Sequence, residues 1–171
     1  CGARDSTRRS LQKGNQEDAE TMYTVSFQSE RRYAGGMKAL LRDYSWWKDL
    51  VGMVAARADS FVLRCWPEEP EALALGRRFG SPVENTQTRE MVFRGPVTED
   101  FLREIRENGF DETGCLKWFT LIFYKGDVPL FSSEHYGAEP YLFMETREEV
   151  EKLRAWCEKY PVITRVDVFE G

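Results

Sequence analysis

The fold class is decided by the stretch Lys117-Trp118-Phe119-Thr120-Leu121-Ile122-Phe123-Tyr124, followed by Lys125-Gly126-Asp127 and Val128-Pro129-Leu130-Phe131. It is a short, nearly unbroken apolar and aromatic run that ends in a glycine-containing turn. This pattern predicts a central strand covered on both faces, then a tight hairpin into a second strand. Proline cannot donate a ladder hydrogen bond, so Pro129 predicts that the second strand lies at a sheet edge or carries a bulge.

Further strands and helices are predicted on both sides of this hairpin. Period-two alternation and β-branched or aromatic runs predict strands over 23–27, 60–66, 90–94, 141–144 and 162–169. Helical spacing of apolar residues predicts a long helix over 37–58 and a short one over 70–79. Two later helices begin at clear caps, which are Thr98 and the capping box from Thr146 to Glu149.

The order of these elements predicts an α+β fold. Consecutive hairpin strands make an all-parallel sheet impossible, because parallel neighbours need long crossover connections. We therefore predict a single mixed, largely antiparallel sheet built from βαβ and hairpin units, with helices packed against it. One domain is expected over residues 22–171, and the polar stretch 81–88 is the candidate internal seam.

Residues 1–21 differ from the rest of the chain in composition. They contain one large aliphatic side chain, Leu11, so they cannot bury enough apolar area to offset the entropy of ordering. We expect a disordered tail or linker. It is either a remnant upstream of a natural start at Met22, a natural disordered arm, or the lipidated start of a processed bacterial lipoprotein. Cys1-Gly2 and the polar linker resemble such a start in composition only.

Charge and composition exclude several classes of partner. The formal net charge of -5 argues against nucleic acid as the main partner, and the apolar run 50–56 is too short to cross a bilayer. One histidine and four cysteines without a CxxC pair predict no metal site. No glycine-rich phosphate loop occurs, so no cofactor is expected. A reducing, cytoplasmic location is predicted, with envelope anchoring as the alternative if Cys1 is lipidated; a disulfide among Cys65, Cys115 and Cys157 stays open.

A candidate catalytic group lies in the loop Ser132-Ser133-Glu134-His135-Tyr136-Gly137. His135 is the one side chain whose ordinary pKa lies near neutrality, as general acid–base catalysis prefers. Ser132 is the candidate nucleophile and Glu134 the candidate acid. Neighbours along a loop do not make a triad, however, so we favour a polar loop whose side chains bond the backbone.

A candidate partner-binding stripe lies on the predicted long helix. Its main apolar side includes Trp47, Val51 and Val54, whereas Trp46, Leu50 and Met53 lie roughly opposite. A helix that is apolar on two sides is either buried between layers or exposes one stripe to a partner. We favour the first case, in which the short helix or the loop after it covers the stripe.

These features together favour a protein-binding function. One acidic, aromatic-rich domain without a catalytic motif resembles, in composition and size, the bacterial toxin-neutralising immunity proteins. We therefore predict a non-enzymatic protein-binding module, such as an immunity or inhibitor protein, whose partner has a basic surface. The alternative is a small hydrolase or transferase that uses the loop 132–136.

Overall fold

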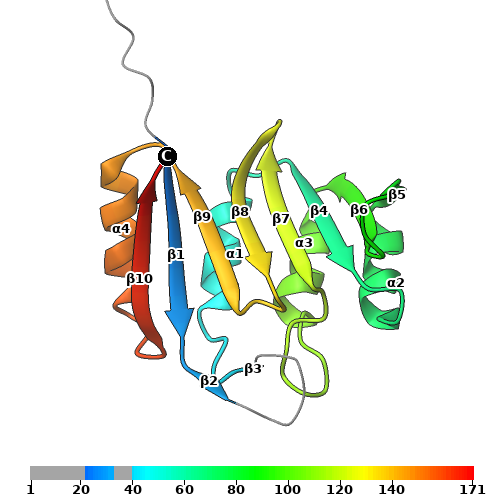
Figure 1. Cartoon of the computed structure of the whole chain (residues 1–171), viewed down its shortest axis with the longest axis horizontal. Helices are drawn as coiled ribbons and strands as arrows, with labels where there is room; N and C mark the ends of the chain where they lie inside the picture. The colour runs from blue at the N-terminus through cyan, green and yellow to red at the C-terminus, as the bar shows by residue number, and fades with distance from the viewer. Residues whose placement is uncertain (1–21, 33–39) are drawn as a thin grey trace, which may run out of the picture.

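The computed structural model describes residues 22–32 and 40–171, and its centre is one eight-stranded sheet (Figure 1). Every pairing between neighbouring strands of this sheet is antiparallel, so the predicted α+β class is confirmed. The predicted tail 1–21, with Cys1, lies outside the described residues.

The strands in spatial order are β10 (Ile163–Glu170), β1 (Tyr23–Ser29), β9 (Glu139–Met144), β8 (Val128–Glu134), β7 (Thr120–Lys125), β4 (Ser60–Cys65), β6 (Met91–Pro96) and β5 (Ser81–Val83).

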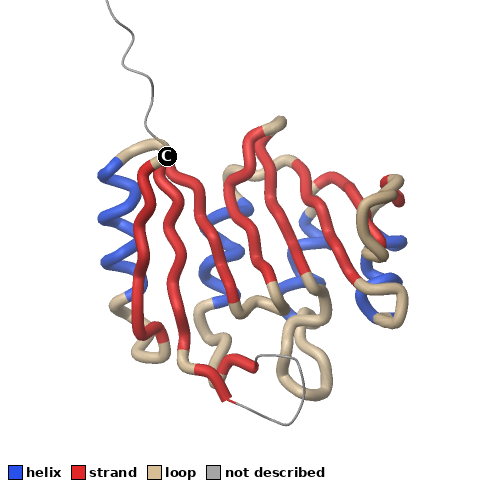
Figure 2. Tube along the Cα trace, viewed as in Figure 1, coloured by secondary structure: helices blue, strands red, loops and turns tan. Residues whose placement is uncertain are grey.

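The helices cover one face of the sheet. Figures 1 and 2 show the other face free of helices. β7 is therefore covered on one side only: Leu121 and Phe123 are fully buried, whereas Ile122 and Tyr124 on the other side are half-buried. The prediction that this strand is covered on both faces was wrong. The helices are α1 (Trp47–Ala55), α2 (Pro70–Phe79), α3 (Glu99–Glu107) and α4 (Arg147–Cys157).

The hairpin at the centre of the sheet carries the predicted bulge. Phe123 pairs with Phe131, but Tyr124 pairs with Pro129, so Leu130 is an extra residue in β8. β8 also pairs with β9 from Phe131 to Glu134, which rules out the alternative that the second strand lies at a sheet edge. The register shift is how the ladder accommodates a residue without an N–H group.

The helical crossovers join strands that are not direct neighbours. β9 and β10 both pair antiparallel with β1, so α4 connects two parallel strands with β1 between them. In the same way, α3 connects β6 and β7, with β4 between them. β5 pairs with β6, so the segment 81–88, predicted as a loop, begins as the edge strand of this sheet.

The helix predicted over 37–58 is much shorter. The described chain forms β3 (Leu40–Leu41), paired with β2 (Arg31–Arg32), and α1 begins only at Trp47; residues 33–39 lie outside the described residues. A turn separates the two elements, because the Ser45 N–H donates to Asp43 Oδ1 at 2.7 Å. Aspartate favours such local turns over a helix interior.

Aromatic side chains fill the core between the sheet and the helices. Phe61 of β4 stacks on Phe101 of α3 with ring centres 4.0 Å apart. The Trp47 Nε1–H donates to the Ile105 carbonyl at 2.9 Å, which joins α1 to α3. Among the described residues, no helix is long and apolar enough to cross a membrane.

Three cysteines lie in this core as free thiols, namely Cys65, Cys115 and Cys157. Burial is the main reason that the pKa of Cys65 rises to about 12 and that of Cys157 to about 11. Because the thiolate is the reactive form, Cys65 and Cys157 are unsuited to nucleophilic chemistry near neutral pH.

Candidate functional site

The loop predicted as a candidate catalytic site joins β8 to β9 through an unusual backbone. His135 and Tyr136 have φ values of 49° and 58°, and Gly137 follows with 83°. Side chains other than glycine's rarely adopt such left-handed angles. Two hydrogen bonds join the turn to distant parts of the chain: the Tyr136 N–H donates to the Phe119 carbonyl at 3.1 Å, and the Tyr44 hydroxyl donates to the Tyr136 carbonyl at 2.9 Å.

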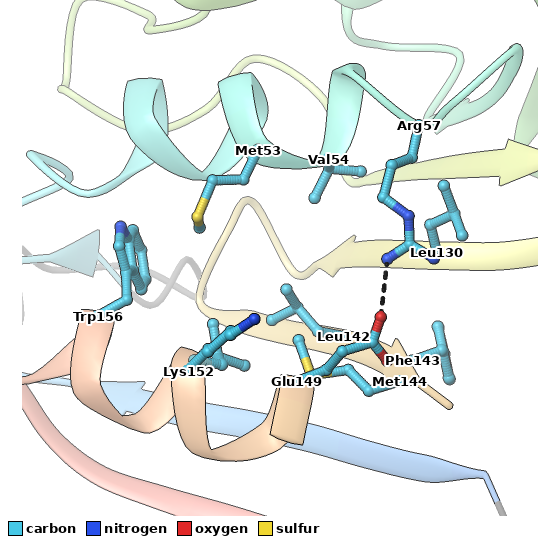
Figure 3. Close-up of a pocket in the computed structure, with 11 residues that line it drawn as sticks. Met53, Val54, Arg57, Leu130, Leu142, Phe143, Met144, Glu149, Lys152 and Trp156 are labelled. Carbon is cyan, nitrogen blue, oxygen red and sulfur yellow. Dashed lines mark hydrogen bonds and ion pairs between the residues drawn. The ribbon is translucent and has the colours of Figure 1, made fainter. Parts of the chain in front are cut away.

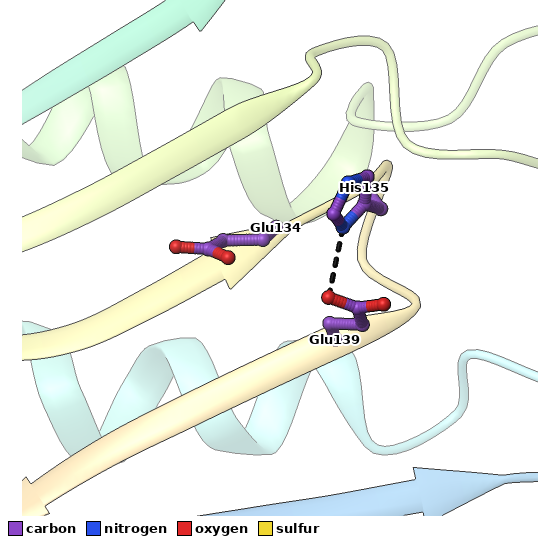
Figure 4. A group of neighbouring side chains, drawn as sticks. All are labelled: Glu134, His135 and Glu139. Carbon is purple, nitrogen blue, oxygen red and sulfur yellow. Dashed lines mark hydrogen bonds and ion pairs between the residues drawn. The ribbon is translucent and has the colours of Figure 1, made fainter.

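The histidine of this loop lies next to a carboxylate and is not bonded to the candidate nucleophile Ser132. His135 Nδ1 lies 2.8 Å from Glu139 Oε2 (Figure 4), and the histidine side chain is 52% exposed. The Ser132 hydroxyl instead donates to Glu134 at 3.3 Å. No hydrogen bond within the described chain joins Ser132 to His135. The structure therefore supplies an oriented imidazole without a nucleophile on its other nitrogen.

The same loop offers a set of metal-ligating atoms. Glu134, His135 and Glu139 each present one such atom, and these lie within 4.8 Å of one another. Imidazole and carboxylate ligands suit several divalent ions. His135 is exposed and both carboxylates are half-buried, so all three groups still reach solvent and are stable without an ion. The cluster could hold a metal but does not by itself require one.

Tyr136 links this loop to the start of α2. Its hydroxyl bonds to Glu69, and its pKa is raised, first by burial and then by the charge of that carboxylate. Glu69 also accepts a hydrogen bond from the Trp66 N–H at 2.8 Å. A carboxylate held by two donors has a fixed position, so Glu69 forms a rigid wall of the hollow described next.

An acidic hollow of about 420 Å³ lies between the start of α2 and the loop before β7. We call it the acidic hollow throughout. Asp111 fixes the loop side, because its Oδ1 accepts from the N–H groups of Thr113 at 2.9 Å and Cys115 at 3.1 Å. The charged lining of the acidic hollow consists of five carboxylates and one ammonium group, namely Glu68, Glu69, Glu71, Asp111, Glu112 and Lys117.

Few cations compensate Glu68, Glu71 and Glu112 of the acidic hollow. Glu68 pairs with Arg89, which is 75% exposed. Within the described residues, neither Glu71 nor Glu112 takes part in an ion pair, and both are exposed. Placing like charges together in one concave surface produces a strong negative potential there. The acidic hollow is thus the most one-sided charge feature around a described pocket.

A second hollow, of about 200 Å³, is apolar and lies between α1 and α4 over β9 (Figure 3). We call it the apolar pocket. Met53, Leu142 and Trp156 face it, and an ion pair between Arg57 and Glu149 at 3.5 Å closes one side. Such a pocket with a polar rim is shaped for an apolar side chain or a small apolar ligand.

The predicted partner-binding stripe is not a surface. Trp46 and Leu50 are fully buried, and only Met53, 42% exposed, reaches solvent. Trp46 packs edge-to-face on Phe27 of β1 at 4.9 Å and lies beside Tyr44, so β1 and the turn before α1 cover it, not α2. The assignment of Trp46 and Leu50 to partner binding was wrong. Met53 lines the apolar pocket, and its role in partner binding stays a prediction.

Sequence reasoning missed the acidic hollow and the partner of His135. The presence of Glu68 and Glu69 in the sequence is explained by the start of a helix, where the dipole favours acidic residues. Asp111 and Glu112 lie about 40 residues further along the chain, and no local pattern signals that both groups face one hollow. Glu139 follows His135 by four residues, a spacing that gains meaning only when the left-handed turn is known.

Comparison of the chain with models of known protein families, with curated proteins and with solved structures finds no significant match.

Proposed function

We propose that this protein is a non-enzymatic protein-binding module whose acidic hollow holds a basic surface of a protein partner. The observation that carries this proposal is the convergence of Glu68, Glu69 and Glu71 with Asp111 and Glu112 from a distant loop. Gathering like charges costs free energy in the isolated protein. Lysine or arginine side chains of a partner would relieve that repulsion on binding.

The spacing of these carboxylates favours side chains over a single metal ion. Among the described residues, the one group of three potential ligand atoms within 4.8 Å of one another is at the loop 134–139, and none of its three residues lines the acidic hollow. A divalent ion needs ligands that close around it at short distances. Carboxylates spread around about 420 Å³ instead suit several cationic groups on a larger partner. The net charge of -5 opposes a nucleic acid partner in the same way.

The concrete form of this function is a bacterial immunity or inhibitor protein that neutralises a basic toxin or enzyme. An acidic surface suits such a role, because electrostatic attraction speeds association with a basic target. The three free, buried thiols support a reducing compartment such as the cytoplasm. Met53 at the rim of the apolar pocket would supply an apolar contact at a separate place on the surface.

The test compares the proteins captured by two double variants. Both remove two negative charges, one variant from the acidic hollow and the other from elsewhere on the surface. The doubly neutralised variant Glu71→Gln/Glu112→Gln removes two exposed carboxylates from the acidic hollow. The control Glu84→Gln/Asp127→Asn removes two exposed carboxylates elsewhere. Each is used as bait in its own cell extract, and captured proteins are quantified by mass spectrometry. We expect the first variant to lose a basic partner by roughly tenfold or more, and the control to keep it. Equal capture by both variants would refute the proposal.

A second candidate is a small hydrolase or transferase that uses the loop 132–136. The hydrogen bond from His135 to Glu139 favours it, since a carboxylate orients a catalytic imidazole in the same way. Its weakness is the separate bonding of Ser132 to Glu134. Screening the protein and His135→Asn against ester and acyl-transfer substrates tests this candidate. Turnover that disappears in the variant would support it.

A further inference from the structure

The two edges of the sheet differ in how well they are protected. β5 forms one edge with three residues, and one of them is Pro82, which cannot donate a hydrogen bond. β10 forms the other edge with eight residues and no proline, and within residues 22–32 and 40–171 no strand pairs with its outer side (Figure 2). A long, unprotected edge strand is a template for pairing with another strand.

The hydrogen-bond pattern shows which backbone groups of β10 face the open edge. The Gly171 N–H donates to the Met22 carbonyl at 3.0 Å, so these two opposed residues form a hydrogen-bonded pair. Hydrogen-bonded and non-hydrogen-bonded pairs alternate along an antiparallel ladder. Asp167 therefore belongs to another hydrogen-bonded pair, and its N–H and C=O groups point toward β1. The N–H and C=O groups of Val166 and Val168 therefore point away from β1, toward the open edge.

The side chains of β10 alternate between the two faces of the sheet. Val166 and Val168 lie opposite the buried Phe27 and Val25, and so face the helices. Arg165 and Asp167 face the helix-free side, where Arg165 Nε lies 2.7 Å from Asp167 Oδ1. On its helix-free face the edge strand thus carries one positive and one negative residue, placed symmetrically on either side of Val166.

We propose that β10 pairs antiparallel with β10 of a second copy of this chain, about a two-fold axis at Val166. In this register Val166 lies opposite its own counterpart, and the backbone groups of both point into the new ladder. Arg165 of each copy lies opposite Asp167 of the other. These are non-hydrogen-bonded pairs, in which cross-strand side chains are closest. The two eight-stranded sheets become one continuous sheet.

Charge selects this register over its neighbours. An axis at Arg165 places two arginines opposite each other, and an axis at Asp167 places two aspartates opposite each other, both of which are unfavourable. An axis at Val168 places Asp167 opposite the exposed, apolar Phe169. The self-complementary charges are the reason to assign the edge to a second copy and not to an unrelated strand.

A groove of about 340 Å³ lies beside β10, between this strand and α4. Its lining includes the exposed Ala155 and the charged Arg154 and Glu158. Both signs of charge occur there, so two copies do not meet with like charges alone. The regular ladder is short, because Thr164 sits at a register shift with β1. We therefore expect a weak dimer, with a dissociation constant of roughly 10–100 µM.

Sedimentation equilibrium of the full chain over about 1 to 500 µM tests this proposal. The natural sequence should dimerise within that range. Arg165→Asp and Asp167→Arg should each be monomeric, since each places like charges opposite each other. An equimolar mixture of these two variants should form a heterodimer, because every opposed pair is then of opposite sign.

Circular dichroism and thermal unfolding verify that both variants are folded. If the natural protein stays monomeric throughout the concentration range, the proposal is overturned, and β10 pairs with a different partner or with no partner. Dimers that persist in both single variants would also overturn it, because the interface would then lie elsewhere. Restored pairing in the mixture is a result that a general loss of stability could not produce.

Discussion

At the scale of single residues, Leu50 and Met53 lie three positions apart on α1 but in opposite environments. Leu50 is fully buried and Met53 is 42% exposed. We expect Leu50→Asp to lower the free energy of unfolding by about 3 kcal/mol or more, since it buries an unpaired carboxylate. The matched Met53→Asp should lower it by only about 0.5 kcal/mol. Urea unfolding of both variants measures this difference. Similar losses would contradict the burial of Leu50.

Gly137 and Gly126 form a second matched pair, because both have positive φ. A Cβ at Gly137 would lie 2.5 Å from Leu116 Cδ1 and 2.9 Å from Tyr44 Cε1, whereas one at Gly126 meets nothing within 4 Å. We expect Gly126→Ala to cost about 1 kcal/mol from backbone strain alone. Gly137→Ala should cost about 2 kcal/mol or more, since its neighbours are buried. Equal shifts in thermal unfolding would disprove this crowding at the β8–β9 turn.

Residue spacing predicted which side chains are apolar and could not predict what covers them. The pattern around Trp46 and Leu50 indicated a helix that is apolar on two sides. Whether the second side was packed or exposed depended on Phe27, which lies 19 positions before Trp46 and reaches it only because β1 runs beside the turn before α1. Burial is decided by contacts distant in sequence, whereas periodicity is local.

At the scale of elements, the start of α4 was fully predictable. Thr146 and Glu149 form the capping box that their spacing predicts: the Glu149 N–H donates to Thr146 Oγ1 at 3.1 Å, and Glu149 accepts from the Thr146 N–H at 3.1 Å. The start of α1 was not predictable. The helical spacing of apolar residues continues through the turn at Asp43, and this spacing was a stronger signal for a helix than one aspartate was for a turn.

The capping carboxylate gives α4 a pH-dependent stability. Partial burial of Glu149 raises its pKa, but hydrogen bonds from the N–H groups of Glu145 and Thr146, with Arg57 nearby, outweigh burial and lower it. The resulting stability is present above the unfolded-state pKa of about 4.3 and is lost as pH falls through the lower folded-state pKa. Glu149→Gln should therefore destabilise the protein by about 0.5 kcal/mol at neutral pH.

Urea unfolding of this variant and of the natural protein, at pH 7 and near pH 3, checks the expectation. The difference in unfolding free energy should shrink at the lower pH, because both side chains are then largely neutral. Glu148→Gln, a neighbouring exposed carboxylate in the same first turn, serves as the control. A difference that is the same at both pH values would contradict a role for the charge.

At the scale of the whole molecule, the class of fold was predictable, but the arrangement of its strands was not. Hairpins and alternation indicated an α+β sheet. The order in that sheet places β4 between β6 and β7, and β1 between β9 and β10, and no local pattern encodes such insertions. The acidic hollow depends on this arrangement, because it brings the start of α2 beside the loop that contains Asp111.

We propose that the acidic hollow attracts a basic protein partner through charge. Stopped flow from about 20 to 300 mM salt measures this attraction as the association rate constant with the captured partner. The natural protein should associate roughly tenfold or more slowly at the higher salt. Glu71→Gln/Glu112→Gln should associate more slowly at low salt and depend less on salt, whereas Glu84→Gln/Asp127→Asn should follow the natural protein. An association rate that does not change with salt, or that responds equally to both variants, would contradict the account.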